Sequence, residues 1–224
     1  MEVLEKIAQV IYEGDTEKTI EYAKQAVAEG LDPNVIINDG GVKGLDKLGE
    51  DFDNLEVFLP ELMLGAESMK ALIAEMAPLL EAQGESAYKG TVVIGCAKGD
   101  LHDIGMNLVA TQLAINGFKI FNMGTDVGVG EYIDKAKEVD ANIIAVSSLM
   151  TTSAYYQEEL VSRLSVEGLR DKYKVVVGGG PITPTWTKKI GADGYSRTSN
   201  LAVDLCIDLV GTDANTQQEP LIYE

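Results

Sequence analysis

Apolar residues in the first 82 positions recur at steps of three and four, which is the spacing of amphipathic helices. Asp15 or Thr16 can cap the second of these helices, and Pro33 takes the first position of the third. Phe58-Leu59-Pro60 opens the fourth, and we expect the apolar Phe58 to point out of the bundle because it precedes the helix. Four such helices with short loops predict an antiparallel bundle over residues 1–82.

The third predicted helix is unusually rich in glycine. Gly40, Gly41, Gly44 and Gly49 all fall inside it, and each costs about 1 kcal/mol relative to alanine in a helix interior. We therefore expect a neighbouring helix or a ligand to approach this helix closely.

The pattern changes after residues 83–90, a polar stretch with Gly84 and Gly90 that is predicted to be a linker and hinge. Beyond it, short apolar runs alternate with helical patterns. Strands are expected at 91–96, 118–122, 142–147, 174–178 and near 193–196, with helices at 104–116, 130–138, 153–166, 183–190 and 199–210. Five β-α units predict an α/β domain over residues 91–210, a parallel sheet covered on both faces. Residues 211–224 are polar and are expected to form a poorly ordered C-terminal tail.

Composition fits a soluble globular protein, because 46% of the 224 residues are hydrophobic and no apolar run approaches the roughly 20 residues of a membrane span. The acidic, amphipathic N-terminus is unlike a signal peptide. Cys96 and Cys206 fall within a predicted strand and a predicted helix, which indicates buried reduced thiols. We expect a cytoplasmic protein with no membrane partner.

Acidic residues outnumber basic ones by 36 to 18, for a net charge of −18. Residues 1–88 contribute 19 acids and 6 lysines to this imbalance. Binding of a nucleic acid by a basic face is therefore excluded as the expected function. A solvated surface explains the charge more simply than a specific role in steering partners.

The chain's only histidine, His102, lies between a predicted strand and a predicted helix. Open α/β sheets place their ligand sites at such turns, and imidazole is the commonest side-chain metal ligand. Asp100 can accept the N–H of the ring nitrogen that does not bind a metal, and Gly105 lets a bulky group approach the backbone. A lone histidine near a helix start is more often an ordinary loop residue, so a ligand role needs support from elsewhere in the chain.

That support comes from the ends of the third and fourth predicted strands. The third leads into the hydroxyl-rich stretch 147–153, and the fourth leads into Gly178-Gly179-Gly180-Pro181. In a flavodoxin-like strand order, 2-1-3-4-5, the first, third and fourth strands are adjacent and flank the ligand crevice. Hydroxyls and bare backbone would line this crevice and suit a large polar ligand.

The three motifs together resemble the cobalamin-binding signature. They are Asp-x-His-x-x-Gly at 100–105, Ser-x-Leu at 147–149 and Gly-Gly at 178–179, separated by 41 and 28 residues. The preceding bundle, with Phe58-Leu59-Pro60-Glu61-Leu62-Met63, resembles the helical cap domain of the same proteins. The chain is similar to the stand-alone corrinoid proteins of methyltransferase systems in anaerobic archaea and bacteria, and to the cobalamin module of methionine synthase.

This resemblance implies a role for each matching residue. His102 would be the lower axial ligand of cobalt, held by Asp100, with Ser153 extending the relay. Further contacts with the cofactor would come from Gly99, Leu101, Asp103 and Gly105; from Ser147, Leu149 and Thr151 along the nucleotide tail; from Gly178 and Gly179, which leave room for that tail; from Tyr195 and Ser199 near the fifth strand; and from Phe58, Leu62 and Met63 as an apolar lid over the upper face.

The resemblance also implies a corrinoid methyl carrier. Co(I) would accept a methyl group from a donor-specific methyltransferase, and methyl-Co(III) would pass it to a second methyltransferase that acts on a folate or a thiol. A reductive activase would be a third partner. The chain shows no nucleophile or acid/base pair for substrate chemistry, so it is expected to be incomplete as an enzyme alone. The donor stays open among methanol, methylamines, betaines and methoxylated aromatics.

Two alternative functions use the same cofactor. A cobalamin-dependent sensor needs an output element, usually a DNA-binding helix-turn-helix, and nothing in residues 1–30 is typical of one. The corrinoid subunit of a mutase needs a large catalytic barrel, which would have to be a separate chain. The predicted cap bundle favours the methyl carrier over both alternatives.

Overall fold

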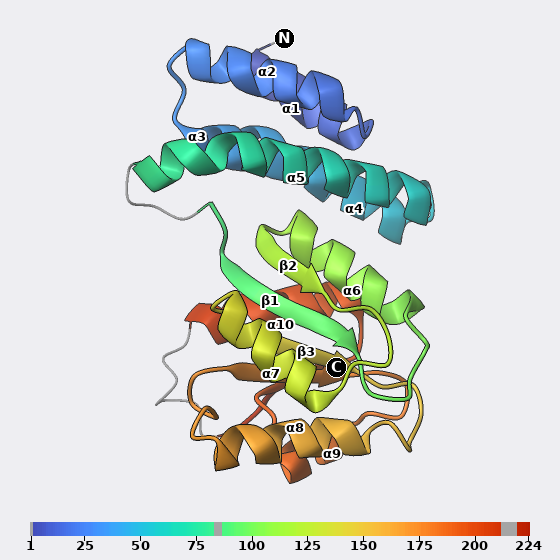
Figure 1. Cartoon of the computed structure of the whole chain (residues 1–224). Coiled ribbons are helices and arrows are strands. Elements are labelled where there is room, and N and C mark those ends of the chain that lie inside the picture. The colour runs from blue at the N-terminus through green and yellow to red at the C-terminus, as the bar shows by residue number, and fades with distance from the viewer. Residues whose placement is uncertain (1, 83–86, 212–218) are drawn as a thin grey trace. The chain divides into compact units, whose positions relative to one another are not determined.

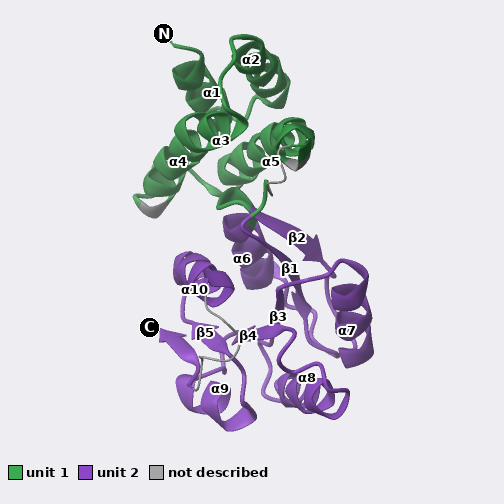
Figure 2. Cartoon of the chain, turned by 90° about the vertical axis from the view of Figure 1, so that its left-hand side faces the viewer, with its two compact units in different colours: residues 1–88, 114–117 green, residues 89–113, 118–224 purple. Residues whose placement is uncertain are grey.

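The computed structural model describes residues 2–82, 87–211 and 219–224. The chain forms two compact units, one of Met1–Tyr88 with Ala114–Gly117 and one of Lys89–Leu113 with Phe118–Glu224 (Figure 2). Residues 83–86 of the predicted linker, including Gly84, lie outside the described residues. Within the described ranges, no helix combines the length and apolar character needed to cross a membrane.

The N-terminal unit is entirely helical. Its elements are α1 (Val3–Tyr12), α2 (Thr16–Ala28), α3 (Pro33–Val35), the π-helix η1 (Ile36–Val42), α4 (Lys43–Asp53) and α5 (Leu59–Ala82). Asp15 caps α2 by accepting a hydrogen bond from the Lys18 amide at 3.0 Å. Pro33 begins α3, and α3, η1 and α4 follow one another without a loop, so they form the third helix predicted from the sequence.

Close helix packing explains most of the glycines in that run. A Cβ at Gly41 would lie 2.6 Å from the Met69 sulfur, and one at Gly40 would lie 3.0 Å from Ile7. A Cβ at Gly44 would overlap the carbonyl oxygen of Ala8. The expectation of a close neighbour is therefore confirmed at these positions, whereas a Cβ at Gly49 would meet nothing within 4 Å.

The second unit is a parallel α/β sheet (Figure 1). Its strands are β1 (Gly90–Cys96), β2 (Phe118–Asn122), β3 (Ile143–Ser147), β4 (Lys174–Gly178), β5 (Gly194–Ser196) and β6 (Leu221–Tyr223). Its helices are α6 (Ile104–Ile115), α7 (Val129–Glu138), α8 (Tyr155–Val166), α9 (Pro184–Ile190) and α10 (Ser199–Gly211). The strand order β2-β1-β3-β4-β5-β6 begins with the predicted flavodoxin-like order.

Alternating strand residues divide the apolar core between the two faces of the sheet. Val93 of β1 belongs to the cluster beneath α7, α8 and α9, whereas Val92 and Ile94 belong to the cluster beneath α6 and α10. Cys96 and Cys206 lie in this second cluster as buried free thiols, as predicted. Burial raises the pKa of the Cys206 thiol to about 12.

The C-terminal edge of the sheet differs from the sequence-based prediction. Residues 221–223 pair in parallel with β5, so the expected count of five strands and the expected disorder of the whole tail are wrong. The amide of Leu221 donates to Asp193 O at 2.9 Å, and the amide of Arg197 donates to Tyr223 O at 2.9 Å. Pairing satisfies backbone groups along β5 that would otherwise be free. Residues 212–218 of the predicted tail lie outside the described residues.

Candidate functional site

The three sequence motifs meet at one edge of the sheet. Cys96, the last residue of β1, is in register with Ser147 of β3, and Ser147 is in register with Gly178 of β4. The carboxyl ends of these strands therefore lie side by side, as predicted. This edge is where open parallel sheets bind their ligands.

A buried carboxylate organises this edge. Asp100 is fully buried and accepts five hydrogen bonds. Its Oδ1 receives the backbone amide of His102 at 3.1 Å and lies 2.8 Å from His102 Nδ1. Its Oδ2 receives the amides of Leu149 at 2.7 Å and Met150 at 3.2 Å, and the Ser153 hydroxyl at 2.6 Å. One carboxylate thus joins His102 and Ser153 in a single hydrogen-bonded chain.

The hydrogen bonds keep this carboxylate charged. Burial by itself would raise the pKa of Asp100, but the hydrogen bonds from Ser153, His102 and Leu149 outweigh it and hold the pKa well below its ordinary value. An ionised Asp100 can only accept at Oδ1, so His102 Nδ1 carries the proton in this contact. His102 Nε2 then keeps its lone pair, as a metal-binding imidazole requires.

The His102 side chain projects toward solvent from this anchored base. It is 53% exposed, whereas the Asp100 side chain is completely buried. In the part of the chain that the structure describes, His102 Nε2 has no hydrogen-bond partner. The arrangement therefore presents one oriented, uncommitted nitrogen at the surface of the α/β unit.

Asp126 supports the same loop and was not found by sequence reasoning. Its Oδ1 accepts the amide of Gly99 at 2.8 Å and forms an ion pair with Lys98 Nζ at 3.1 Å, and its own amide donates to Asp100 O at 3.0 Å. Gly99 has φ +78°, in the left-handed region that favours glycine. The hydrogen bond from Gly99 is the main reason that the pKa of Asp126 is lowered. No spacing rule pointed to Asp126, because it comes from the loop after β2.

Gln157 is a second supporting residue that the sequence did not reveal. Its buried side-chain amide donates to Val146 O at 3.0 Å and to Gly178 O at 3.2 Å. Its side-chain oxygen accepts from the indole nitrogen of Trp186 at 3.0 Å. Gln157 thereby ties the ends of β3 and β4 together at the site.

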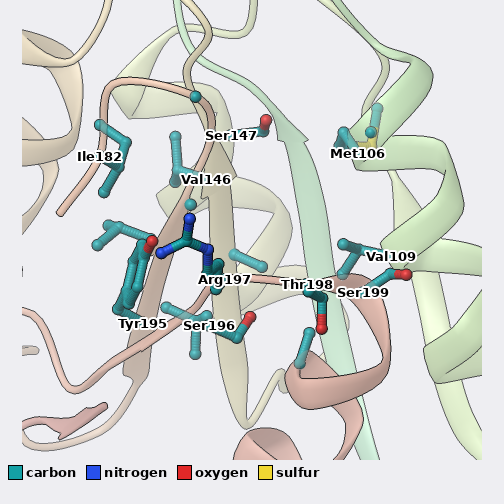
Figure 3. Close-up of a pocket in the computed structure, with 18 of the residues that line it drawn as sticks. Met106, Val109, Val146, Ser147, Ile182, Tyr195, Ser196, Arg197, Thr198 and Ser199 are labelled. Carbon is teal, nitrogen blue, oxygen red and sulfur yellow. The ribbon is translucent and has the colours of Figure 1, made fainter. Parts of the chain in front are cut away.

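A cavity of about 600 Å³ opens beside these strand ends (Figure 3). Six of the predicted site residues line it: Gly105, Ser147, Gly178, Gly179, Tyr195 and Ser199. The sequence had not singled out other lining residues, among them Ile94, Met106, Val109, Ile182, Ser196, Arg197, Thr198 and Glu224. Its wall therefore combines apolar side chains with hydroxyls and bare backbone.

The remaining predicted residues lie outside this cavity. Leu101 and Leu149 expose 69% and 49% of their surface, and Thr151 is also exposed. Asp103 precedes α6, where its carboxylate accepts from the Asn107 side chain at 3.0 Å. Leu101 lies in the loop directly after Asp100, and Leu149 lies just beyond the end of β3.

The predicted lid residues belong to the helical unit. Phe58 and Met63 are exposed apolar side chains, at 65% and 52%. Leu62 is fully buried, and its spacing on α5 places it on the same stripe as the buried Met69 and Met76. Phe58 and Met63 are therefore accessible on the surface of this unit, as a lid residue must be, whereas Leu62 is part of its core.

Gly179 is required by the backbone of the site. It has φ +118°, and a Cβ there would overlap the backbone oxygen of Ser148. We expect Gly179→Ala to destabilise the α/β unit by roughly 3 kcal/mol, through strained backbone and displacement of the β3 end. Thermal unfolding of the protein without cofactor measures this loss.

Gly178→Ala is the matched control, because a Cβ at Gly178 would meet nothing within 4 Å. Its unfolding temperature should stay close to that of the wild type. Equal unfolding temperatures for Gly179→Ala and Gly178→Ala would contradict the structural requirement at Gly179.

Comparison with known proteins finds two matches to B12 binding domains, over residues 3–76 and 90–204. A corrinoid protein of Desulfitobacterium hafniense (strain Y51) is 39% identical over 213 residues, covering 94% of this chain and 99% of that protein. Trimethylamine corrinoid protein 2 of Methanosarcina mazei is 39% identical over 203 residues, covering 90% of this chain and 93% of that protein. The solved methanol:cobalamin methyltransferase complex MtaBC of Methanosarcina barkeri matches with a TM-score of 0.81 and 27% identity, over 96% of this chain and 82% of that one.

Proposed function

The chain belongs to the corrinoid proteins of methyltransferase systems, and from this premise we propose that it carries methyl groups from a methylated amine to a second methyltransferase. It is a corrinoid-binding methyl carrier. The observation that carries the proposal for its site is the His102 imidazole, anchored through Nδ1 on the buried Asp100 with Nε2 left free. The relatives favour this function over a sensor or a mutase subunit.

The residues of the α/β unit fit a corrinoid that has a nucleotide tail. The cavity of about 600 Å³ at the strand ends offers Met106 and Val109 to a flat aromatic base and the hydroxyls of Ser147 and Ser199 to a sugar. When bound, the corrinoid supplies a cobalt centre that can accept a methyl group and give it up again.

His102, Asp100 and Ser153 have distinct proposed roles. His102 Nε2 is the nitrogen that would ligate cobalt. Asp100 holds the ring orientation and keeps the proton on Nδ1, and Ser153 stabilises the charge of that carboxylate.

Methyltransferase partners supply the substrate chemistry. The described residues that line the cavity include no cysteine, lysine or histidine that could act as a nucleophile or base on a methyl donor. A structural relative is part of a methanol:cobalamin methyltransferase complex. We propose one donor-specific partner, one partner that uses a folate or thiol acceptor, and a reductive activase that restores the cofactor.

The named relatives support one class of donor. The trimethylamine and dimethylamine corrinoid proteins are 38–40% identical to this chain over 82–91% of its length, whereas the structure from the methanol system is 27% identical. These identities support a methylated amine as donor. The donor-specific methyltransferase, rather than this chain, would recognise the amine itself.

A methyl-transfer assay tests this proposal. The cobalamin-loaded, reduced protein is mixed anaerobically with trimethylamine and a trimethylamine-specific methyltransferase, and the visible spectrum is followed. We expect methylation of the cofactor with this pair, and none with methanol and the methanol methyltransferase. Methylation with methanol alone would contradict the amine assignment, and no methylation by either would contradict the carrier function.

The helical unit at 1–82 is proposed as a cap over the upper face of the cofactor, joined through residues 83–90. The support is the pair of exposed apolar side chains Phe58 and Met63. The same preparation tests it when loaded with methylcobalamin, because a cap holds the photolysis fragments together so that they recombine. Exchange of both residues for serine should speed anaerobic photolysis, and Val166→Ser, at a residue 87% exposed in the other unit, should not. Equal rates in all three proteins would contradict the cap.

A further inference from the structure

Arg197 is an isolated cation in an acidic protein. The chain has three arginines, and the other two form ion pairs, Arg163 with Glu167 at 2.9 Å and Arg170 with Asp193 at 2.8 Å. The Arg197 guanidinium forms no ion pair or hydrogen bond in the described ranges of the chain. Acids outnumber bases by 36 to 18, so an arginine without an acidic partner stands out.

The fold fixes the backbone of Arg197, and its side chain is exposed. Arg197 lies between the end of β5 and the start of α10, and its backbone amide donates to Tyr223 O of β6 at 2.9 Å. Its side chain lines the cavity together with the hydroxyl residues Ser196, Thr198 and Ser199 of the same segment (Figure 3). Among the described residues that line this cavity, Arg197 is the only cation.

A guanidinium beside several hydroxyls matches a phosphate group. Arginine presents planar donors that pair with phosphate oxygens, and hydroxyls add further donors. The nucleotide tail of a complete corrinoid carries a single phosphodiester charge. Glu224 also lines the cavity and would repel that charge, so a compensating cation is needed.

We infer that Arg197 binds the phosphate of the nucleotide tail and makes the cavity select corrinoids with a complete tail. This inference rests on the proposed corrinoid-carrier function. The hydroxyls of Thr198 and Ser199 assist, and the apolar wall formed by Met106 and Val109 receives the base. Arg197 is thus a specificity-determining residue for the cofactor, and it takes no part in holding the metal.

Two corrinoids separate this contact from the rest of the site. Cobalamin has the complete nucleotide tail, whereas cobinamide lacks the phosphate, the sugar and the base. Dissociation constants for both are measured by equilibrium dialysis on wild type, Arg197→Gln, Arg197→Lys and Arg163→Gln. Arg163→Gln is the matched control, because it removes a guanidinium from a surface ion pair outside the cavity.

Arg197→Gln should weaken cobalamin binding about tenfold, which corresponds to about 1.4 kcal/mol. Its affinity for cobinamide should equal that of the wild type, and Arg163→Gln should match the wild type for both ligands. Arg197→Lys should recover part of the cobalamin affinity, because it keeps the charge but loses the planar donor pair. Circular dichroism of each variant confirms that the fold is retained.

Four results would overturn the inference or the function on which it rests. Unchanged cobalamin affinity in Arg197→Gln, or an equal loss for cobinamide, would overturn the inference and leave the carrier function intact. A further arm measures cobinamide binding in the presence of inorganic phosphate. If phosphate made cobinamide bind wild type as tightly as cobalamin does, and had no such effect on Arg197→Gln, Arg197 would bind free phosphate. The inferred selection for a complete tail would then also fail. A wild-type protein that binds neither corrinoid would contradict the proposed function itself.

Discussion

Asp100→Ala is expected to lower the stability of the α/β unit by about 3 kcal/mol or more. The carboxylate accepts five hydrogen bonds, and alanine would leave the amides of Leu149 and Met150 without their acceptor. Each buried donor left unpaired costs about 1–3 kcal/mol. Thermal unfolding of the protein without cofactor measures the loss.

Asp134→Ala is the control for this substitution, because Asp134 is an exposed aspartate on α7 of the same unit. Its unfolding temperature should match that of the wild type. An Asp100→Ala protein as stable as Asp134→Ala would show that the carboxylate does not hold the loop.

The pH dependence of stability also tests whether the Asp100 carboxylate is charged in the folded protein. The pKa of Asp100 is lowered from its ordinary value of 3.8. The stabilisation by its charge is therefore complete above pH 3.8 and is lost as the pH falls through the lowered folded-state pKa. The difference in unfolding temperature between wild type and Asp100→Asn should be full at neutral pH and shrink in acid. A difference that is constant with pH would contradict the charged state of Asp100.

His102→Ala is expected to produce the largest change in the bound cofactor and little change in stability. The side chain is 53% exposed, and its loss removes only one of the five hydrogen bonds to Asp100, the one from Nδ1. The visible spectrum of bound cob(III)alamin should shift, because a nitrogen ligand is removed from the metal. Cobalamin affinity should fall by roughly tenfold or more, on the scale of losses at metal-site residues.

A fold control accompanies the spectrum. His102→Ala should unfold only slightly below the wild-type temperature, because Asp100 keeps its other four hydrogen bonds, so a spectral change belongs to the ligand position. Coincident spectra for His102→Ala and wild type, both saturated with cob(III)alamin, would contradict the role of His102.

The hydrogen-bonded pair Asp100 and His102 could be predicted from the sequence, because a separation of two residues lets one turn bring their side chains together. Ser153 lies 53 positions after Asp100, and its contact was expected only from the resemblance to the corrinoid proteins. Gly40, Gly41 and Gly44 could be interpreted because their helix cost needed a compensating contact. Contacts between residues close in sequence, and those fixed by a regular fold, could thus be predicted from the sequence.

Other residues of the site make contacts that no sequence pattern predicts. Asp126 and Arg197 lie in loops whose path is set by the whole sheet. Gln157 is a buried polar residue on α8, at a position where helical periodicity predicts an apolar side chain. The strand β6 has three residues, too few for an alternating pattern to be detected. Its pairing with β5 is decided by the free edge of the sheet rather than by its own sequence.

The most direct test of cobalt ligation by His102 uses the fact that this residue is the single histidine of the chain. Labelling a tag-free protein with ¹⁵N-histidine places the isotope at His102 alone, and the bound cob(II)alamin is examined by electron paramagnetic resonance. We predict that the triplet splitting from a ¹⁴N axial ligand in unlabelled protein becomes a doublet in the labelled protein. A triplet that persists after labelling would show that the cofactor's own base ligates cobalt, and would contradict the role of His102.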